Sequence, residues 1–146
     1  MEIDIQCEGI ERLLGRFQQM GLNSEPFLDR AVEKGAYRLQ AEIKPLVPVD
    51  EGTLRNSISV EKTGHLQYSV GTNLEYAPYV EYGTGKLGDP SVPHTEKPYW
   101  RYFSDRLGHW VTTSGQPAQH FMHNGFENGK DEAVETVRKE LLKWLT

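Results

Sequence analysis

The chain has 146 residues, of which 16 are basic and 21 acidic, and its formal net charge is −5. This balance argues against nucleic acid or an anionic membrane as the main ligand, because phosphate groups are bound by basic surfaces. No apolar run reaches the roughly 18 to 20 residues of a membrane span. The single cysteine, Cys7, cannot form an internal disulfide, which fits a reducing cytoplasm.

The first 44 residues predict a strand and two helices. Apolar and polar residues alternate over 2–7, which is typical of a strand, and helical spacing follows over 10–21. Apolar residues then recur every three or four positions over 24–44, which predicts a long helix with Ser24 as its N-cap. Pro45 disfavours helical angles in the residue before it, so this helix should end there.

Residues 48–58 predict a rigid corner between the long helix and a strand. Pro48 cannot continue a helix, Asp50 can accept hydrogen bonds from nearby backbone N–H groups, and Gly52 can adopt a positive φ. We expect this structural corner to comprise Pro48, Asp50, Gly52, Leu54 and Ser57.

The remaining segments predict two hairpins and a last helix. Alternation within 53–72 and 99–113 indicates antiparallel strands, which we expect to form one sheet. Residues 84–98 are rich in Gly and Pro and predict a flexible loop. The last helix should begin between Ala118 and Lys130, its first turns being weakened by two glycines. The fold class is therefore α+β in a single domain, 1–146, with the sheet covered on one face by two long helices.

No motif predicts catalysis, and we expect neither a metal nor a cofactor. His120 and His123 could share a helix face, but zinc needs three or four ligands, and His94 and His109 are separated from them by predicted loops. Gly83 to Lys86 lacks the frame of a phosphate-binding loop. A small metal-dependent enzyme that uses these histidines remains an alternative.

The density of aromatic residues points instead to contacts with other proteins. Tyr, Trp and Arg are enriched at interface hot spots. Stacking of single-stranded nucleic acid is an alternative use of aromatic rings, but few basic residues accompany them, and ordinary core and sheet packing is expected for about half of the aromatic set. The aromatic set is Tyr76, Tyr79, Tyr82, Tyr99, Trp100, Tyr102, Phe103 and Trp110.

Three motifs occur in one order. Pro-Val-Asp-x-Gly-x-Leu-x-x-Ser-Ile begins at Pro48, Tyr-Ala-x-Tyr-Val-Glu-Tyr-Gly-Thr-Gly at Tyr76, and Gly-Gln-Pro-Ala-Gln-x-Phe-Met at Gly115. With these motifs the chain resembles the gene-product-ten-like tail-component family of long-tailed bacteriophages, over about residues 2–145. It departs from the family pattern at Glu51, His120 and 123–125.

The resemblance implies a curved sheet covered by helices and a non-enzymatic head–tail connector or tail-completion protein. It implies a ring, commonly hexameric, in the neck of the virion, assembled in the host cytoplasm. The ring would join a head-completion or connector protein to a tail-terminator or tail-tube protein, and DNA would pass through without specific binding. A tail terminator or another minor tail protein is the nearest alternative.

The resemblance also assigns roles to particular residues. The second motif would shape loops that face neighbouring subunits, and the third would position the last helix. The expected interface residues are Tyr76, Tyr79, Glu81, Tyr82, Gly83, Thr84, Gly85, Trp100 and Arg101. The residues expected to position the last helix are Gly115, Pro117 and Phe121.

Overall fold

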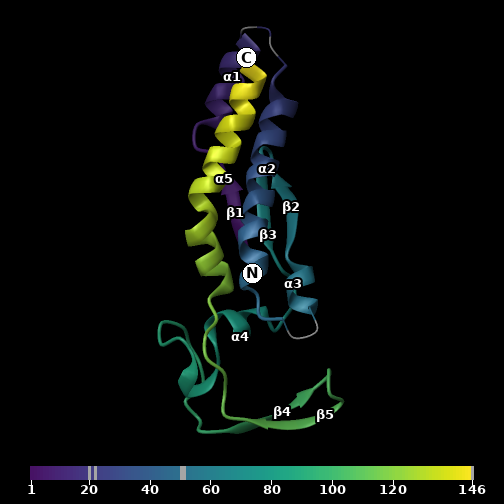
Figure 1. Cartoon of the computed structure of the whole chain (residues 1–146), viewed down its shortest axis with the longest axis vertical. Coiled ribbons are helices and arrows are strands. Elements are labelled where there is room, and N and C mark those ends of the chain that lie inside the picture. The colour runs from purple at the N-terminus through teal and green to yellow at the C-terminus, as the bar shows by residue number, and fades with distance from the viewer. Residues whose placement is uncertain (20, 22, 50–51, 146) are drawn as a thin grey trace. The chain divides into compact units, whose positions relative to one another are not determined.

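A computed structural model describes residues 1–19, 21, 23–49 and 52–145. The chain forms two compact units, each of which is described by itself. Unit 1 comprises 1–73 and 121–146, and unit 2 comprises 74–120. The predicted α+β class is confirmed, with antiparallel strands, a short N-terminal strand and helix, and two long helices (Figure 1).

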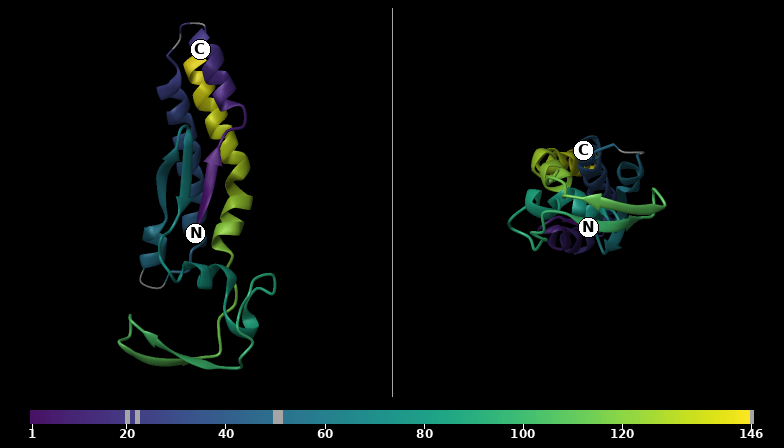
Figure 2. Two further views of the ribbon diagram at one scale, coloured as in Figure 1. Left: turned by 180° about the vertical axis from the view of Figure 1, so that it is seen from behind. Right: turned by 90° about the horizontal axis from the view of Figure 1, so that it is seen from below.

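Unit 1 contains the two long helices packed along each other, as both views of the ribbon show (Figures 1 and 2). Its helical elements are α1 (Ile10–Gln19), α2 (Glu25–Ile43), the 3₁₀ turn η1 (Lys44–Leu46), α3 (Thr53–Ser57) and α5 (Phe121–Leu145). The apolar face of α2 is buried, and Leu28, Val32 and Ile43 are fully inaccessible to solvent. Each such side chain stabilises the fold by about 1.5–3 kcal/mol.

Helix α2 starts and ends where the sequence predicts, but Ser24 caps its N-terminus through the main chain and not through the side chain. The main-chain oxygen of Ser24 accepts hydrogen bonds from the first turn, whereas its hydroxyl makes no capping hydrogen bond. The α-helix ends at Ile43 and tightens into a 3₁₀ turn that contains Pro45.

The sheet of unit 1 has three antiparallel strands in the order β1-β3-β2, and α2 lies over it. Its strands are β1 (Glu2–Gln6), β2 (Ser59–Gly64) and β3 (Gln67–Gly71). The Tyr68 hydroxyl donates to Asp29 at 2.7 Å and lies 3.1 Å from a Glu33 oxygen, which ties β3 to α2. Lys62 on β2 forms an ion pair with the same Asp29 at 2.8 Å.

Two details of the predicted sheet are wrong. Residues 53–57 form a helix, because the corner turns the chain once more before the strand begins at Ser59. Residues 99–113 do form the second hairpin, but within the described residues its strands pair with each other and not with the first sheet, which gives two sheets there in place of one. Local alternation predicts that a segment is a strand without indicating which strand it will pair with.

Three glycines allow α2 and α5 to approach closely. A Cβ atom on Gly125 would lie 2.8 Å from the Cα of Ile43, and one on Gly129 would lie 2.7 Å from the Cγ of Glu42. On α2, a Cβ on Gly35 would lie 2.7 Å from Val137. The glycines therefore belong to the packing of the helix pair, and α5 begins at Phe121 without interruption.

His65 at the β2–β3 turn joins α1 to α2. Its two ring nitrogens lie 2.6 Å from a Glu11 oxygen and 2.7 Å from a Glu25 oxygen. These hydrogen bonds, that to Glu25 first, raise the pKa of His65 above its ordinary value.

This pKa shift predicts that unit 1 loses stability as the solution becomes alkaline. Because the folded-state pKa exceeds the unfolded value of about 6.5, the stabilisation is complete below that pH and is lost as pH rises through the folded pKa. Urea denaturation of wild type and His65→Gln between about pH 6 and pH 8.5 checks this. We expect the wild type to weaken more steeply than the variant, and parallel pH profiles would contradict the prediction.

Unit 2 contains few regular elements. These are α4 (Ala77–Tyr82), the 3₁₀ turn η2 (Gly85–Leu87), and the two-stranded sheet of β4 (Trp100–Ser104) and β5 (His109–Thr113). The sequence excludes a central strand at 76–82 because of Pro78, and the structure places this proline in the first turn of α4.

Candidate functional site

The corner after α2 lies in unit 1 and contains the short helix α3. Gly52 has a φ of 75° at its N-cap, and Leu54 is buried. Pro48 is exposed in the connection before α3. The chain passes from α2 through η1 and α3 to β2, and Asp50 lies outside the described residues.

Ser57 fastens this corner to the end of the sheet. Its hydroxyl lies 2.6 Å from the main-chain oxygen of Leu54 and 2.7 Å from the hydroxyl of Thr72. The amide of Thr72 donates in turn to the main-chain oxygen of Met1 at 2.8 Å. Ser57 near the end of the first motif is therefore hydrogen-bonded to Thr72, the residue that follows β3 in unit 1.

Replacement of Ser57 by alanine is expected to lower the free energy of unfolding by about 1 kcal/mol, because it removes hydrogen bonds that are partly shielded from water. Chemical denaturation measures this loss. Ser59→Ala is the matched control, since Ser59 is exposed on the neighbouring strand. Equal stability of the two variants would contradict the assigned role of Ser57.

The second and third motifs come together in unit 2. Thr84 and Gln116 exchange main-chain hydrogen bonds of 2.9 and 3.2 Å in an isolated antiparallel bridge. The amide of Gln119 donates to Val80 and that of His120 to Glu81, each at 3.0 Å. One hydrogen-bonded frame therefore holds two segments that lie more than thirty residues apart in the sequence.

Close approach of these segments requires glycine at two motif positions. Gly83 has a φ of 73°, and a Cβ there would lie 2.6 Å from the main-chain nitrogen of Ala118. A Cβ on Gly115 would overlap the main-chain oxygen of Thr84. Pro117 lies exposed between the paired residues and the start of α5, and Phe121, the first residue of that helix in unit 1, is fully buried.

Glu81 is buried, unlike the tyrosines around it in the motif. It is 2% exposed, and one carboxylate oxygen lies 4.0 Å from the ring of His120. The other ring nitrogen of His120 lies 3.4 Å from Asp89. Hydrogen bonds from the side chain and backbone of Ser91 hold the pKa of Asp89 below its usual range. Across the described residues, no group of three His, Cys, Asp or Glu side chains is placed to hold a metal ion.

Exposed apolar side chains gather in unit 2. Its exposed large apolar residues are Tyr76, Tyr79, Tyr82, Leu87, Tyr99, Tyr102, Phe103, Leu107 and Trp110. Among the described residues of this unit, only Ala77 is a buried apolar residue. Unit 2 thus presents aromatic surface to solvent and encloses almost none, an arrangement that marks interaction sites.

The β4–β5 hairpin has two different faces. Trp100 is half-buried, and its ring lies about 3.0 Å from where a Cβ on Gly85 would be. Arg101, the next residue, lies on the opposite face together with Phe103 and Trp110, all three exposed. Of the two neighbouring residues predicted at an interface, Trp100 therefore packs within unit 2 and Arg101 points to solvent.

Two features of the site have no clear signal in the sequence. The burial of Glu81 depends on pairing with a segment near His120 that is remote in the sequence. The pairing of Thr84 with Gln116 joins two loops, where periodicity gives no information. The one sequence feature that indicates this pairing is glycine at positions 83 and 115, because glycine allows two backbone segments to approach closely.

The structure defines a class: a small α+β protein whose second unit exposes aromatic side chains. Residues 11–83, half of the chain, match the family described as "Bacteriophage HK97-gp10, putative tail-component". The chain belongs to this family. No match was found among curated proteins or among solved structures.

Family membership supports a structural component of a bacteriophage tail, located in the virion and in contact with other phage structural proteins. A structural family of this kind favours a non-enzymatic role. Among the helices that the structure describes, none is both long and apolar enough to cross a membrane.

Proposed function

We propose that the protein is a ring-forming adaptor in the neck of a long-tailed phage or prophage, where it completes the tail and joins it to the head connector. One observation carries the proposal: unit 2 exposes nine large apolar side chains and buries only one apolar residue among those described. A chain that leaves this much aromatic surface uncovered is suited to permanent contact with neighbours.

The proposed mechanism is geometric. The frame around Thr84 and Gln116 holds α4 and the hairpin at fixed positions within unit 2, and these elements present their exposed rings to adjoining subunits. Residues 84–98 contact the next ring, with a connector protein on one side and a tail-terminator or tail-tube protein on the other. A closed ring, proposed to be hexameric, uses two different faces of each subunit.

The net charge of −5 suits such a conduit for DNA. A channel lined by acidic side chains repels phosphate groups and lets DNA pass without adhesion. A ring reconstruction with a channel lined mainly by Lys and Arg would contradict this part of the proposal.

Deletion of the gene tests the adaptor role. We expect deletion lysates to contain filled heads and separate tails of normal length, and wild-type virions to contain the protein in a ring stoichiometry by quantitative mass spectrometry. Tails of variable length would favour the tail-terminator alternative, because a terminator stops polymerisation of the tube. Normal infectious particles without the protein would overturn the proposal.

A further inference from the structure

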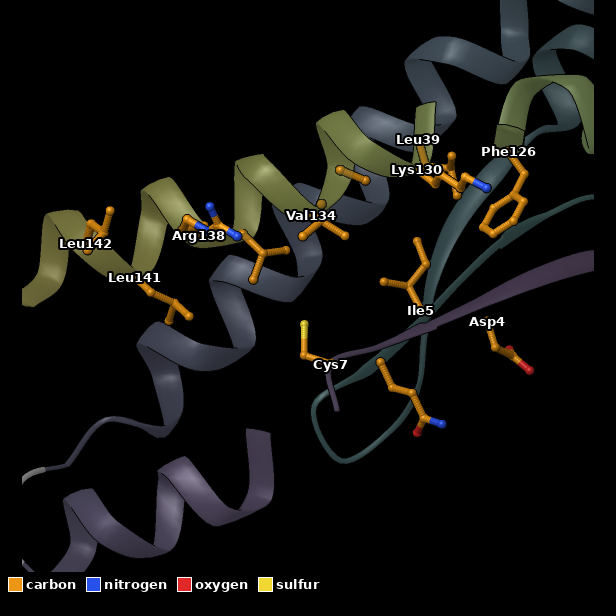
Figure 3. Close-up of a pocket in the computed structure, with 14 residues that line it drawn as sticks. Asp4, Ile5, Cys7, Leu39, Phe126, Lys130, Val134, Arg138, Leu141 and Leu142 are labelled. Atoms are coloured by element: carbon orange, nitrogen blue, oxygen red, sulfur yellow. The ribbon is translucent and has the colours of Figure 1, made fainter. Parts of the chain in front are cut away.

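An apolar groove of about 600 Å³ runs along β1 in unit 1. Figure 3 shows its walls, with Ile5 and Cys7 from β1 and the residue after it, Leu39 from α2, and Phe126, Val134 and Leu141 from α5. Its volume falls within the range of about 300–1,000 Å³ typical of sites that enclose a compact ligand. Strand β1 stands at the edge of its sheet, so one side of its backbone has no strand partner in that sheet.

The charged side chains around the groove already have partners. Lys130 is paired with Glu127 at 2.9 Å and Arg138 with Glu135 at 3.4 Å. Asp4 precedes Ile5 on β1, and its carboxylate points away from the groove (Figure 3) and accepts a hydrogen bond from the hydroxyl of Ser69. An entering group with apolar bulk would therefore complement the groove, whose walls are mainly apolar.

The exposed face of the β4–β5 hairpin supplies such apolar bulk. Phe103 and Trp110 are cross-strand partners whose rings meet edge to face with centroids 5.9 Å apart. The guanidinium of Arg101 lies 5.8 Å from the centre of the Trp110 ring. Both rings are at least half exposed. Because a two-stranded hairpin is at best marginally stable in water, an arm of this kind gains from packing against another surface.

We propose that the Phe103–Trp110 face of the hairpin in one copy of the chain occupies the groove along β1 in the next copy. This inference rests on the proposed ring, since a hairpin with an exposed apolar face and an apolar groove are the two unlike surfaces that a cyclic assembly needs. Unit 1, which contains the groove, carries twelve basic and sixteen acidic residues, whereas 97–113 carries three basic and one acidic.

The expected contact is weak when it is made once. Two aromatic side chains bury about 150–250 Å² each, which is roughly half of the 800 Å² per partner in a stable interface. Closure of a ring or contact with a partner ring supplies the rest, so free protein at low concentration is expected to be monomeric.

The native Cys7 allows a direct test, because it is the single cysteine of the chain and lines the groove. Thr112→Cys puts a second thiol on the exposed face of the hairpin, next to Trp110. After mild oxidation of the full-length protein, concentrated and in particles, we expect a ladder of disulfide-linked oligomers with Cys7 joined to position 112. Peptide mass spectrometry identifies the joined pair.

Two controls make the outcome decisive. His109→Cys places the thiol on the opposite face of the same hairpin and should crosslink at least tenfold less, and Cys7→Ser in the Thr112→Cys chain should remove the ladder. Phe103→Ser with Trp110→Ser should leave the helical circular-dichroism signal of unit 1 unchanged and abolish the crosslink. Equal crosslinking from both faces, a disulfide within one chain, no Cys7 crosslink, or a small apolar molecule recovered from the groove would each overturn the proposal.

Failure of this inference and failure of the adaptor role give different results. Virions that contain the Thr112→Cys protein without a bond to Cys7 contradict the hairpin contact and leave the adaptor role standing. Wild-type virions that contain no copies of the chain contradict the adaptor role itself.

Discussion

Replacement of Gly125 by alanine is expected to lower the free energy of unfolding by about 1–3 kcal/mol, although alanine forms helices better than glycine by about 1 kcal/mol. The added Cβ would lie 2.5 Å from Cγ1 of Ile43 and 2.8 Å from its Cα. The side chain can rotate, but the Cα can move only if α2 and α5 separate along the interface that holds unit 1 together. Urea denaturation followed by circular dichroism at 222 nm (a standard helix signal) measures the loss.

Gly15→Ala is the matched control, because Gly15 also lies within a helix and has no atom within 4 Å of its added Cβ. There the gain in helix propensity acts alone, so we expect stabilisation by about 0.5–1 kcal/mol. Opposite signs for the same substitution in two helices are the diagnostic result. If Gly125→Ala also stabilised the protein, the close packing of α2 on α5 would be contradicted.

Gly83→Ala is expected to disrupt the frame of unit 2 and to reduce incorporation into virions by more than about tenfold, which corresponds to roughly 1.4 kcal/mol. Alanine at the φ of 73° and ψ of −178° of Gly83, a region that essentially only glycine populates, is strained by about 1–3 kcal/mol. Its Cβ would also lie 2.6 Å from both the nitrogen of Ala118 and the oxygen of Gln116. We expect the amides of Thr84 and Gln116 to lose protection from hydrogen exchange, while those in α2 keep theirs.

Gly108→Ala separates the effect of backbone strain from the effect of atomic overlap. Gly108 has a similar φ of 71° at the turn of the hairpin, but its added Cβ has no atom within 4 Å. It imposes backbone strain without overlap, so we expect protected amides at Thr84 and Gln116 and nearly normal incorporation. If the amides of Thr84 and Gln116 lost protection in both Gly83→Ala and Gly108→Ala, the assigned role of Gly83 in the close approach of the two segments would be contradicted.

The helices could be predicted because their apolar spacing is a local property. The residues every three or four positions along 24–44 are the ones that α2 buries, and Pro45 marks the end of the α-helix. The prediction that Gly125 and Gly129 weaken the first turns of the last helix is wrong because it considers local propensity alone. Their effect on helix propensity is local, whereas their value in packing depends on Ile43 and Glu42, which are remote in the sequence.

The candidate surface could be predicted in kind but not in arrangement. The sequence shows a density of aromatic residues and two motif segments, but not that Trp100 packs within unit 2 while Arg101 faces solvent. That distinction follows from the register of β4 against β5 and from contact with Gly85. The groove has no local signature, because its walls come from β1, α2 and α5, at opposite ends of the chain.

The division of unit 1 between 1–73 and 121–146 has a consequence for synthesis. Helix α2 leaves the ribosome long before α5, its main packing partner, and all of unit 2 is translated in between. Unit 1 therefore completes its fold only after residues 121–145 have emerged, so the groove along β1, which needs α5 as a wall, does not exist on a nascent chain. In the proposed assembly, a subunit can therefore receive the hairpin of another copy only after its own α5 has emerged.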